Sequence, residues 1–323
     1  MGSFIGHVLP GIGFLLLGLW HLFNHIKLHT LHPTSYTSPI WFPTSKLRHL
    51  ELVLIIAGCF VFIVIELFVG PKKHHPFDSD GTIPNNHLHN VEHAVIALTI
   101  FTYALLSLII DRAALPAAHG VKKARHSLSL FLAAVAFAQE LLLFRLTSTD
   151  HMGAEGQYHM LLQLIIFVSL ITTLLGFGFP NSFMVSFVRS LSIFFQGVWF
   201  ILVGFMLWTP ALITKGCWMN HEEGHYVVRC DGEASLHRAK SIANLLFSFF
   251  VIGIAVFGAC FYLRMVRIYG ENVDYFSLDL KSDKREDKNT DDVEFQKTNE
   301  LSESYKSFID GHVHVRRFEL APR

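Results

Sequence analysis

Long apolar runs alternate with short polar breaks along most of the chain. A helix that spans the hydrocarbon core needs about 20 residues at 1.5 Å per residue. Seven runs meet that length, at residues 4–26, 47–69, 89–110, 128–146, 159–177, 187–208 and 242–265. Because mid-bilayer offers no water, each spanning segment must satisfy its own backbone hydrogen bonds, which makes each run a helix. The pattern predicts an all-α fold, a seven-helix transmembrane bundle.

The fourth run has the weakest apolar signal, because Gln139, Glu140 and Arg145 interrupt it. Beyond the seventh run the composition changes. Residues 1–270 carry 17 Lys/Arg and 13 Asp/Glu, a net charge of +4, whereas residues 271–323 carry 9 and 13, a net charge of −4. The last segment has few large apolar residues to offset the entropy of ordering it. We therefore predict a transmembrane domain at 1–270 and a disordered, charged tail at 271–323.

The overall composition supports a membrane protein. Apolar residues make up 51% of the chain and charged residues 16%, against roughly 25% charged in soluble domains. The 26 basic residues equal the 26 acidic ones, which argues against a nucleic-acid binder held by net charge. The unusual feature is the 20 histidines. They are where we expect any chemistry to lie.

Charge and cysteines predict the orientation of the bundle. With seven spans the termini lie on opposite faces, and the face that carries the tail has ten Lys/Arg against seven on the other. By the positive-inside rule the tail is cytosolic and the N-terminus is outside or lumenal, in a plasma or internal membrane. Cys217 and Cys230 fall in the 209–236 loop on the outer face, where a disulfide persists. The first apolar run is too long for the core of a cleavable signal peptide, so we expect it to stay in the mature protein.

Polar side chains enter the predicted spans at a common depth near the outer face. Buried imidazoles and carboxylates are costly in a membrane and mark functional sites by default. His89 and His93 are four residues apart, as are His159 and Gln163, so each pair shares a helix face. Imidazole and carboxylate groups together are the ligand set of zinc, copper or iron. We predict a transition-metal site, with zinc favoured, and candidate ligands His7, His89, His93, Glu140, His159 and His237.

A second group of histidines lies toward the inner face. These are His21, His25, His29, His32, His49, His119 and His126. Most stand at predicted helix ends or in loops, where water satisfies them. His7 and His21 are separated by 14 residues on the first helix, a spacing that paired haems use, so haem binding is a minor alternative.

One short motif resembles a zinc-protease signature. His221, Glu222 and His225 fit H-E-x-x-H, but that mechanism requires both histidines on one helix face. Here the match lies in a short loop that contains Gly224. Water-exposed loop histidines are the simpler interpretation.

Four segments carry a resemblance to a known family. GHVLPGIGFLLLGLWHLFNHIK (6–27), HNVEHAVIALTIF (89–101), STDHMGAEGQYHMLLQ (148–163) and RSLSIFFQGVWFILVGFMLW (189–208) are similar to the transmembrane protein 45 family, in its plant branch of viral-response proteins. The resemblance covers about residues 1–270 and implies a seven-helix integral membrane protein with no settled activity. Plant members often have His where this chain has Arg145 and Thr147, which reduces its ligand capacity.

Three functions follow from these features. The first is a metal-binding membrane protein; with one coordination position open to water, it becomes a metal-dependent hydrolase of a lipid-like substrate. The second is a non-catalytic scaffold or trafficking protein linked to defence, whose protein partners the sequence does not identify. The third is a proton or ion transporter that uses buried Glu66, Glu140 and histidines. The apolar inner halves of the spans, such as residues 96–110, argue against a through-path.

Overall fold

The computed structural model describes residues 4–69, 77–84, 87–113, 119–146, 153–222 and 225–287, and the side chains of these ranges except 119–123, 225 and 271–287. The predicted seven-helix architecture is confirmed. The long helices are α1 (Phe4–Leu31), α2 (Leu50–Val64), α3 (Leu88–Ala113), α4 (His119–Leu146), α5 (Gly153–Gly178), α6 (Phe183–Trp208) and α7 (Gly232–Asp287). In the described part of the chain seven helices are long and apolar enough to cross a membrane.

Six of the seven long helices extend beyond the apolar runs that predicted them; α2 begins three residues inside its run. α1 continues for five residues past residue 26, and α4 begins nine residues before residue 128. α2 changes at Ile65 into a π-helical segment, η1 (Ile65–Val69), a form often found at functional sites. These helices are therefore longer than the apolar runs that would lie in the hydrocarbon core. Polar side chains lie in the added turns at the helix ends.

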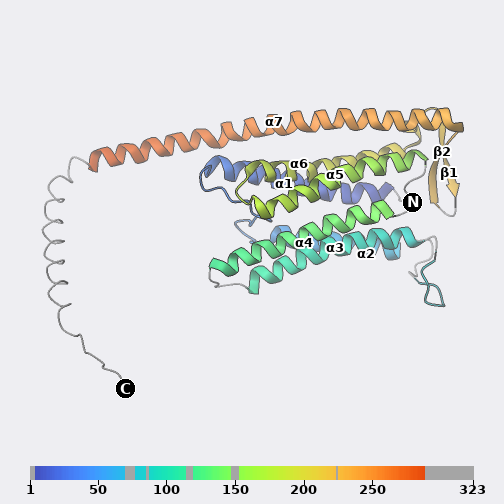
Figure 1. Ribbon diagram of the computed structural model, residues 1–323, viewed down its shortest axis with the longest axis horizontal. Coiled ribbons are helices and arrows are strands. Elements are labelled where there is room, and N and C mark those ends of the chain that lie inside the picture. The colour runs from blue at the N-terminus through green and yellow to red at the C-terminus, as the bar shows by residue number, and fades with distance from the viewer. Residues whose placement is uncertain are drawn as a thin grey trace, which may run out of the picture. The chain divides into compact units, whose positions relative to one another are not determined.

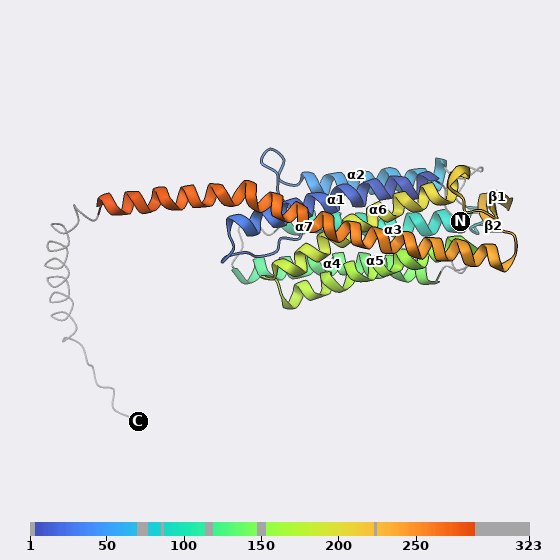
Figure 2. The same cartoon turned by 90° about the horizontal axis from the view of Figure 1, so that it is seen from above.

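The first six helices form a closed ring. α1 packs against α6, followed by α5, α4, α3 and α2, and a sparser contact between α2 and α1 closes the ring. Figures 1 and 2 show these helices running side by side along a common direction. The closest pair is α1 and α6, where Gly11 lies against Gly197, Gly18 against Phe194 and Gly204 against Val8. Small residues at such positions let two membrane helices approach backbone to backbone.

The packed core lies mainly between α5 and α6. Trp199 is fully buried there, and its Nε1 donates to the Tyr158 carbonyl oxygen at 3.1 Å. Further along α5 in the same interface, away from the N-terminus of that helix, the Ser169 and Ser192 hydroxyl oxygens are 2.9 Å apart. Outward faces are apolar and exposed, as at Leu54 (61%) and Phe249 (68%). Apolar surface on this scale matches a bilayer environment.

Two compact units divide the chain, Met1–Val266 and Arg267–Arg323. In the first, α7 lies outside the ring, with the Phe257 ring stacked on Phe194 of α6 at 4.9 Å between centroids. In the second, the structure describes the backbone of α7 as far as Asp287. The predicted tail, residues 271–323, begins within α7, and its remainder beyond Asp287 lies outside the described residues.

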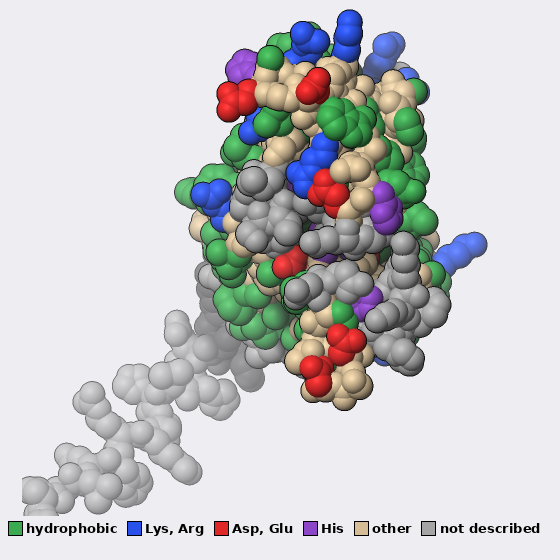
Figure 3. All heavy atoms as spheres, turned by 90° about the vertical axis from the view of Figure 1, so that its right-hand side faces the viewer, with side chains coloured by type: hydrophobic (Ala, Val, Ile, Leu, Met, Phe, Trp, Pro, Cys, Tyr) green, Lys and Arg blue, Asp and Glu red, His purple; other side chains and the backbone are tan. Residues whose placement is uncertain are grey.

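A two-stranded antiparallel hairpin interrupts the helical pattern between α6 and α7. After a 3-10 turn, η4 (Pro210–Leu212), the strands β1 (Cys217–Glu222) and β2 (His225–Cys230) pair from Cys217↔Cys230 to Glu222↔His225. The hairpin lies at the end of the bundle where α1 begins (Figure 1). Figure 3 views this end, where charged and histidine side chains are scattered over the face and hydrophobic ones cover its flanks.

The opposite end is covered by the segment between α1 and α2. Four side chains of this segment are buried, those of Tyr36, Ser38, Ile40 and Phe42. The Ser38 backbone N–H donates to the Pro180 carbonyl oxygen at 2.8 Å, which ties the segment to the α5–α6 turn. What the sequence presents as a polar break is a cap over the interior of the ring.

Candidate functional site

A cluster of histidines lies inside the bundle at the hairpin end. His7 near the start of α1 and His159 in the first two turns of α5 are both 1% exposed. Their Nε2 atoms are 3.1 Å apart and their rings are stacked, 5.4 Å between centroids. Because a neutral imidazole has one donor and one acceptor nitrogen, this contact requires complementary tautomers. Two segments 152 residues apart thus place two ring nitrogens face to face.

Helix packing places these two histidines. A Cβ on Gly204 of α6 would stand 3.4 Å from the Cβ of His7, so the small residue admits His7 to the interior. On α5, Gln163 lies one turn beyond His159, and its Nε2 donates to the Phe144 carbonyl oxygen of α4 at 3.0 Å. The face of α5 that carries His159 is thereby fixed against α4.

His89 and His93 of α3 join the cluster. Their rings are 4.0 Å apart between centroids, and the His93 ring is 6.2 Å from that of His7. His93 Nδ1 lies 3.5 Å from Oε1 of Glu66, which belongs to η1. Asn90 Nδ2 donates to the other oxygen of Glu66 at 2.6 Å. The π-helical segment therefore brings a buried carboxylate behind His93.

Large aromatic rings wall this cluster. The rings of Trp208 and Phe200 lie 4.7 and 6.1 Å from that of His7, and Phe144 lies 5.7 Å from His159, all between centroids. Apolar walls of this kind keep water away from the histidines and strengthen electrostatic interactions among them.

The structure does not bring Glu140 and His237 into the cluster. Glu140 is buried (1% exposed) and its Oε1 accepts a hydrogen bond from Gln196 Nε2 at 2.7 Å, deeper in the ring. His237 is exposed on α7. On the described residues, then, four of the six predicted ligands are neighbours: His7, His89, His93 and His159. Within the same residues no three His, Cys, Asp or Glu side chains are placed to hold a metal ion as they stand.

Most of the inner histidines were expected to be hydrated at helix ends or in loops, but His21 and His25 are buried. They are 6% and 0% exposed. His21 Nε2 lies 2.8 Å from Oε1 of Glu51, and His25 Nδ1 lies 2.9 Å from the Tyr36 hydroxyl. Burial raises the pKa of Tyr36. The spacing of His21 and His25, one helical turn apart, was the available signal, but the folded cap that buries them has no sequence signature.

Glu51 is the centre of this second network. Its Oε2 accepts hydrogen bonds from Trp20 Nε1 at 2.9 Å and from the Phe42 backbone N–H at 2.8 Å, in addition to the His21 contact at Oε1. A carboxylate with three partners is well compensated for its burial. It holds α1, the cap and α2 together.

A third polar group lies at the same end. Asp111 at the end of α3 accepts from His49 Nε2 at 2.9 Å and forms ion pairs with Arg48 at 3.3 Å and Arg125 at 3.0 Å. The residues come from α3, α4 and the segment before α2. They fasten neighbouring helix ends rather than facing the interior.

The protease-like motif lies in the hairpin rather than in the loop expected from its sequence. His221 and Glu222 belong to β1 and His225 to β2, so the helical geometry of a zinc protease is absent at these residues. Glu222 instead forms a two-point ion pair with Arg229, whose Nε donates at 2.8 Å and whose Nη2 lies on the second oxygen. This pairing raises the pKa of Arg229. Cys217 and Cys230 form a disulfide across the base of the hairpin.

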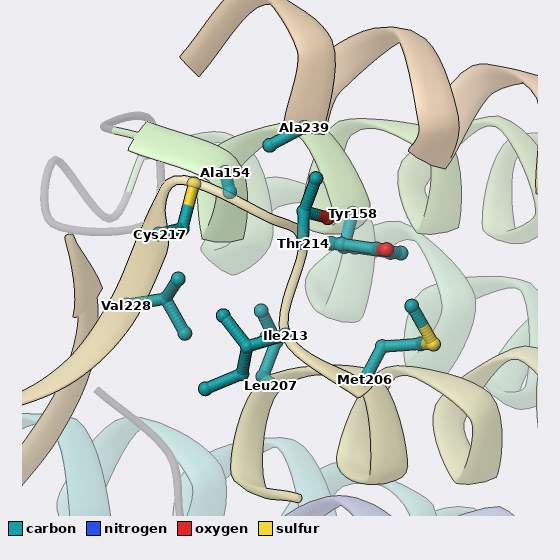
Figure 4. Close-up of a pocket in the computed structure, with 9 residues that line it drawn as sticks. All are labelled: Ala154, Tyr158, Met206, Leu207, Ile213, Thr214, Cys217, Val228 and Ala239. Carbon is teal, nitrogen blue, oxygen red and sulfur yellow. The ribbon is translucent and has the colours of Figure 1, made fainter. Parts of the chain in front are cut away.

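A very small cavity lies beneath the hairpin. Its volume is about 10 Å³, and it is lined mostly by apolar side chains of α5, α6 and the hairpin, including Tyr158, Leu207 and Val228 (Figure 4). That volume holds a single water molecule at most. We regard it as a packing gap rather than a binding site.

Comparison with known families supports the resemblance described above in part. Residues 126–263 match a family of unknown function (DUF716). This is the family of transmembrane protein 45. The match begins in α4 and ends in α7, so it includes His159 but not His7, His89 or His93.

Proposed function

We propose that this multi-pass membrane protein binds a transition-metal ion, with zinc as the favoured metal, between His7 and His159. The observation that carries the proposal is the 3.1 Å separation of the two Nε2 atoms. Two nitrogen ligands about 2.05 Å from one tetrahedral zinc ion are about 3.3 Å apart. The pair therefore has nearly the spacing that a bound ion imposes.

The neighbouring residues supply further ligands. A metal-bound histidine usually directs its other ring nitrogen to a carboxylate, and His93 Nδ1 already faces Glu66 at 3.5 Å. In that arrangement His93 Nε2 is the coordinating atom. His89 Nε2 is buried and lacks a hydrogen-bond partner among the described residues, which makes it the fourth ligand. Both rings must turn toward the His7–His159 pair by side-chain rotation for the set to close.

Metal content of the purified full-length chain tests the proposal. We expect about one zinc ion per chain, lost in His7→Ala and in His159→Ala because each removes one of the two paired ligands. His237→Ala is the matched control: it removes a histidine that the sequence also selects but that is exposed, and it should leave the zinc content unchanged. Stoichiometric zinc that survives both ligand substitutions would refute the site, as would its absence from the wild type.

We also propose that the hairpin end of the bundle faces the extracytoplasmic side. The Cys217–Cys230 disulfide supports this orientation, because disulfides persist in oxidising compartments. The excess of Lys/Arg at the other end agrees with the positive-inside rule. A membrane-impermeant thiol probe tests it with a cysteine introduced at exposed Asn220. Labelling that begins once the plasma membrane alone is permeabilised would place the hairpin in the cytosol and reverse the orientation.

The assignment to the plant branch of the family is a proposal of the same kind. Its support is the four segments quoted from residues 6–208, two of which, 6–27 and 89–101, lie outside the matched range. Alignment with plant and animal members decides it. Grouping of the chain with animal members over these segments would overturn the assignment.

A further inference from the structure

A cavity of about 70 Å³ lies inside the ring of six helices, apart from the histidine cluster at the hairpin end. Each of α1 to α6 contributes to its wall. Most of the wall is apolar, with six polar or titratable side chains among the lining residues: His21, Glu51, Tyr103, Glu140, Thr173 and Arg189. These six come from six different helices. The interior therefore contains a cavity whose mostly apolar wall carries one polar or titratable side chain from each of the six helices.

One side chain of the chamber wall has a buried atom with incomplete hydrogen bonding. Among the described residues, His21 Nδ1 has no hydrogen-bond partner, and neither does Oε1 of Gln196, the residue that donates to Glu140. Arg189 is 6% exposed, and one of its nitrogens donates to Ser38 Oγ at 3.0 Å. A buried polar atom without a partner costs about 1–3 kcal/mol. A polar molecule inside the chamber would supply the missing hydrogen bonds and lower this cost.

Water fits this chamber. A single buried water needs about 10–15 Å³ of such volume and two to four polar partners, and each water takes up about 30 Å³ in the liquid, so 70 Å³ has room for about two to four. The wall supplies donors at Arg189 and acceptors at Glu140 and His21. An organic ligand is excluded by size, because even an apolar cavity that holds benzene is roughly twice as large, about 150 Å³.

We propose that the chamber is filled with water and that Glu140 exchanges its proton through this water with the His21–Glu51 pair. In the forward direction the Glu140 carboxyl group gives its proton to the adjacent water. A proton then passes from the water chain to His21 Nδ1. The products are a Glu140 carboxylate, which accepts a hydrogen bond from Gln196 Nε2, and a His21 imidazolium hydrogen-bonded through Nε2 to the Glu51 carboxylate.

The His21 imidazolium has the Glu51 carboxylate as its partner, and the Glu140 carboxylate has the Gln196 amide as a hydrogen-bond donor, which offsets part of the cost of charge inside a membrane. The Glu51 carboxylate stays in place because Trp20 Nε1 and the Phe42 backbone N–H hold its other oxygen. Tyr103 and Thr173 are the remaining polar side chains on the wall, and neither carries a charge at neutral pH. The ring thus contains a proton-transfer path that runs from Glu140 to the His21–Glu51 pair, towards the capped end of the bundle.

Infrared spectroscopy of the full-length protein in lipid tests this segment. Glu140→Gln keeps the acceptor for Gln196 and identifies the protonated Glu140 carboxyl band by its loss. We expect that band to shift promptly when the wild type is transferred to D₂O. Absence of a Glu140-dependent band, or a band that exchanges no faster than the most protected backbone amides, would overturn the proposal.

Two alanines of α4 provide a matched pair of variants. Ala136 lines the chamber and is 7% exposed, whereas Ala138 is exposed on the same helix. Ala136→Leu should displace water and slow exchange of the Glu140 band about tenfold or more, because exchange then waits for local opening of the bundle. Ala138→Leu should leave it unchanged. Equal rates in the two variants would show that the route does not pass through the chamber.

If Ala136→Leu does not fold, a variant at the other end of the path tests the proton-transfer route instead. His21→Gln removes the acceptor imidazole without filling the chamber, and it should also slow exchange of the Glu140 band. Wild-type exchange in His21→Gln would overturn the role of the His21–Glu51 pair. Zinc content is the readout of the separate histidine cluster, so failure of one proposal does not imply failure of the other.

Discussion

Gly18 of α1 lies directly against the backbone of Phe194 in α6. A Cβ atom at position 18 would stand 2.2 Å from the Phe194 nitrogen and 2.5 Å from its Cα. A second close approach in the same interface lies about one turn away at Gly197. A Cβ atom added there would stand 2.2 Å from the Leu15 nitrogen. Because His7 reaches the interior from α1, this close approach also sets the position of the histidine cluster.

Gly18→Ala should be strongly destabilising. The obstructing atoms are backbone, so the helices must separate, and overpacking of this kind costs about 1–3 kcal/mol or more. Gly13→Ala is the control on the same helix, since a Cβ there meets no atom within 4 Å. It should be neutral or stabilise by up to about 1 kcal/mol through helix propensity. Equilibrium unfolding in mixed micelles gives both values, and equal stability of the two variants would contradict the packing described.

Ser38→Ala should loosen the cap between α1 and α2. Ser38 Oγ accepts from Arg189 Nη2 at 3.0 Å and from the Ser186 hydroxyl at 2.7 Å. Removing the Ser38 hydroxyl leaves the buried Arg189 and Ser186 donors without this acceptor, at a cost of about 1–3 kcal/mol. Ser35→Ala removes an exposed hydroxyl from the same segment and serves as the control. Hydrogen exchange of residues 36–42 should accelerate only in Ser38→Ala; similar protection in both would argue against this anchor.

Glu51→Ala should destabilise the bundle more than Glu51→Gln. Alanine leaves the Trp20 and Phe42 N–H groups without an acceptor, for a loss of about 2–5 kcal/mol. The glutamine carbonyl oxygen can still accept from both groups while its amide faces His21. Thermal unfolding followed by circular dichroism should rank wild type, Glu51→Gln and Glu51→Ala in that order. An alanine variant as stable as the glutamine variant would not fit these contacts.

Replacing Cys217 and Cys230 together by serine should destabilise the hairpin. The bridge closes a loop with a sequence separation of 13, and a loop near that length is worth about 3 kcal/mol. Limited proteolysis between residues 213 and 231 should become faster. Cys260→Ser alters an exposed, unbridged cysteine and should have no such effect. Alkylation of the unreduced wild type should modify Cys59 and Cys260 alone; labelling of Cys217 would contradict the disulfide.

The apolar runs were sufficient to predict seven helices, because the absence of water in a bilayer leaves a long apolar segment no other way to satisfy its backbone. Counting residues along those helices also placed His7, His89, His93 and His159 at one level, since successive spans run in opposite directions. Those four are the predicted ligands that the fold makes neighbours. The periodicity of one helix, however, does not say which side of it faces the interior.

That choice depended on the tertiary structure. Glu140 and His237 meet the same depth criterion, yet one lines the central chamber and the other is exposed, because the packing of each helix against its neighbours decides which of its sides faces the interior. The partners of His21 and His25, Glu51 and Tyr36, lie 30 and 11 residues away, in α2 and in the cap respectively. A polar break in the sequence carries no sign of whether it will extend into water or fold over the end of the ring. The sequence determined how many helices there are and what chemistry they carry; the packing of backbones decided which side chains meet.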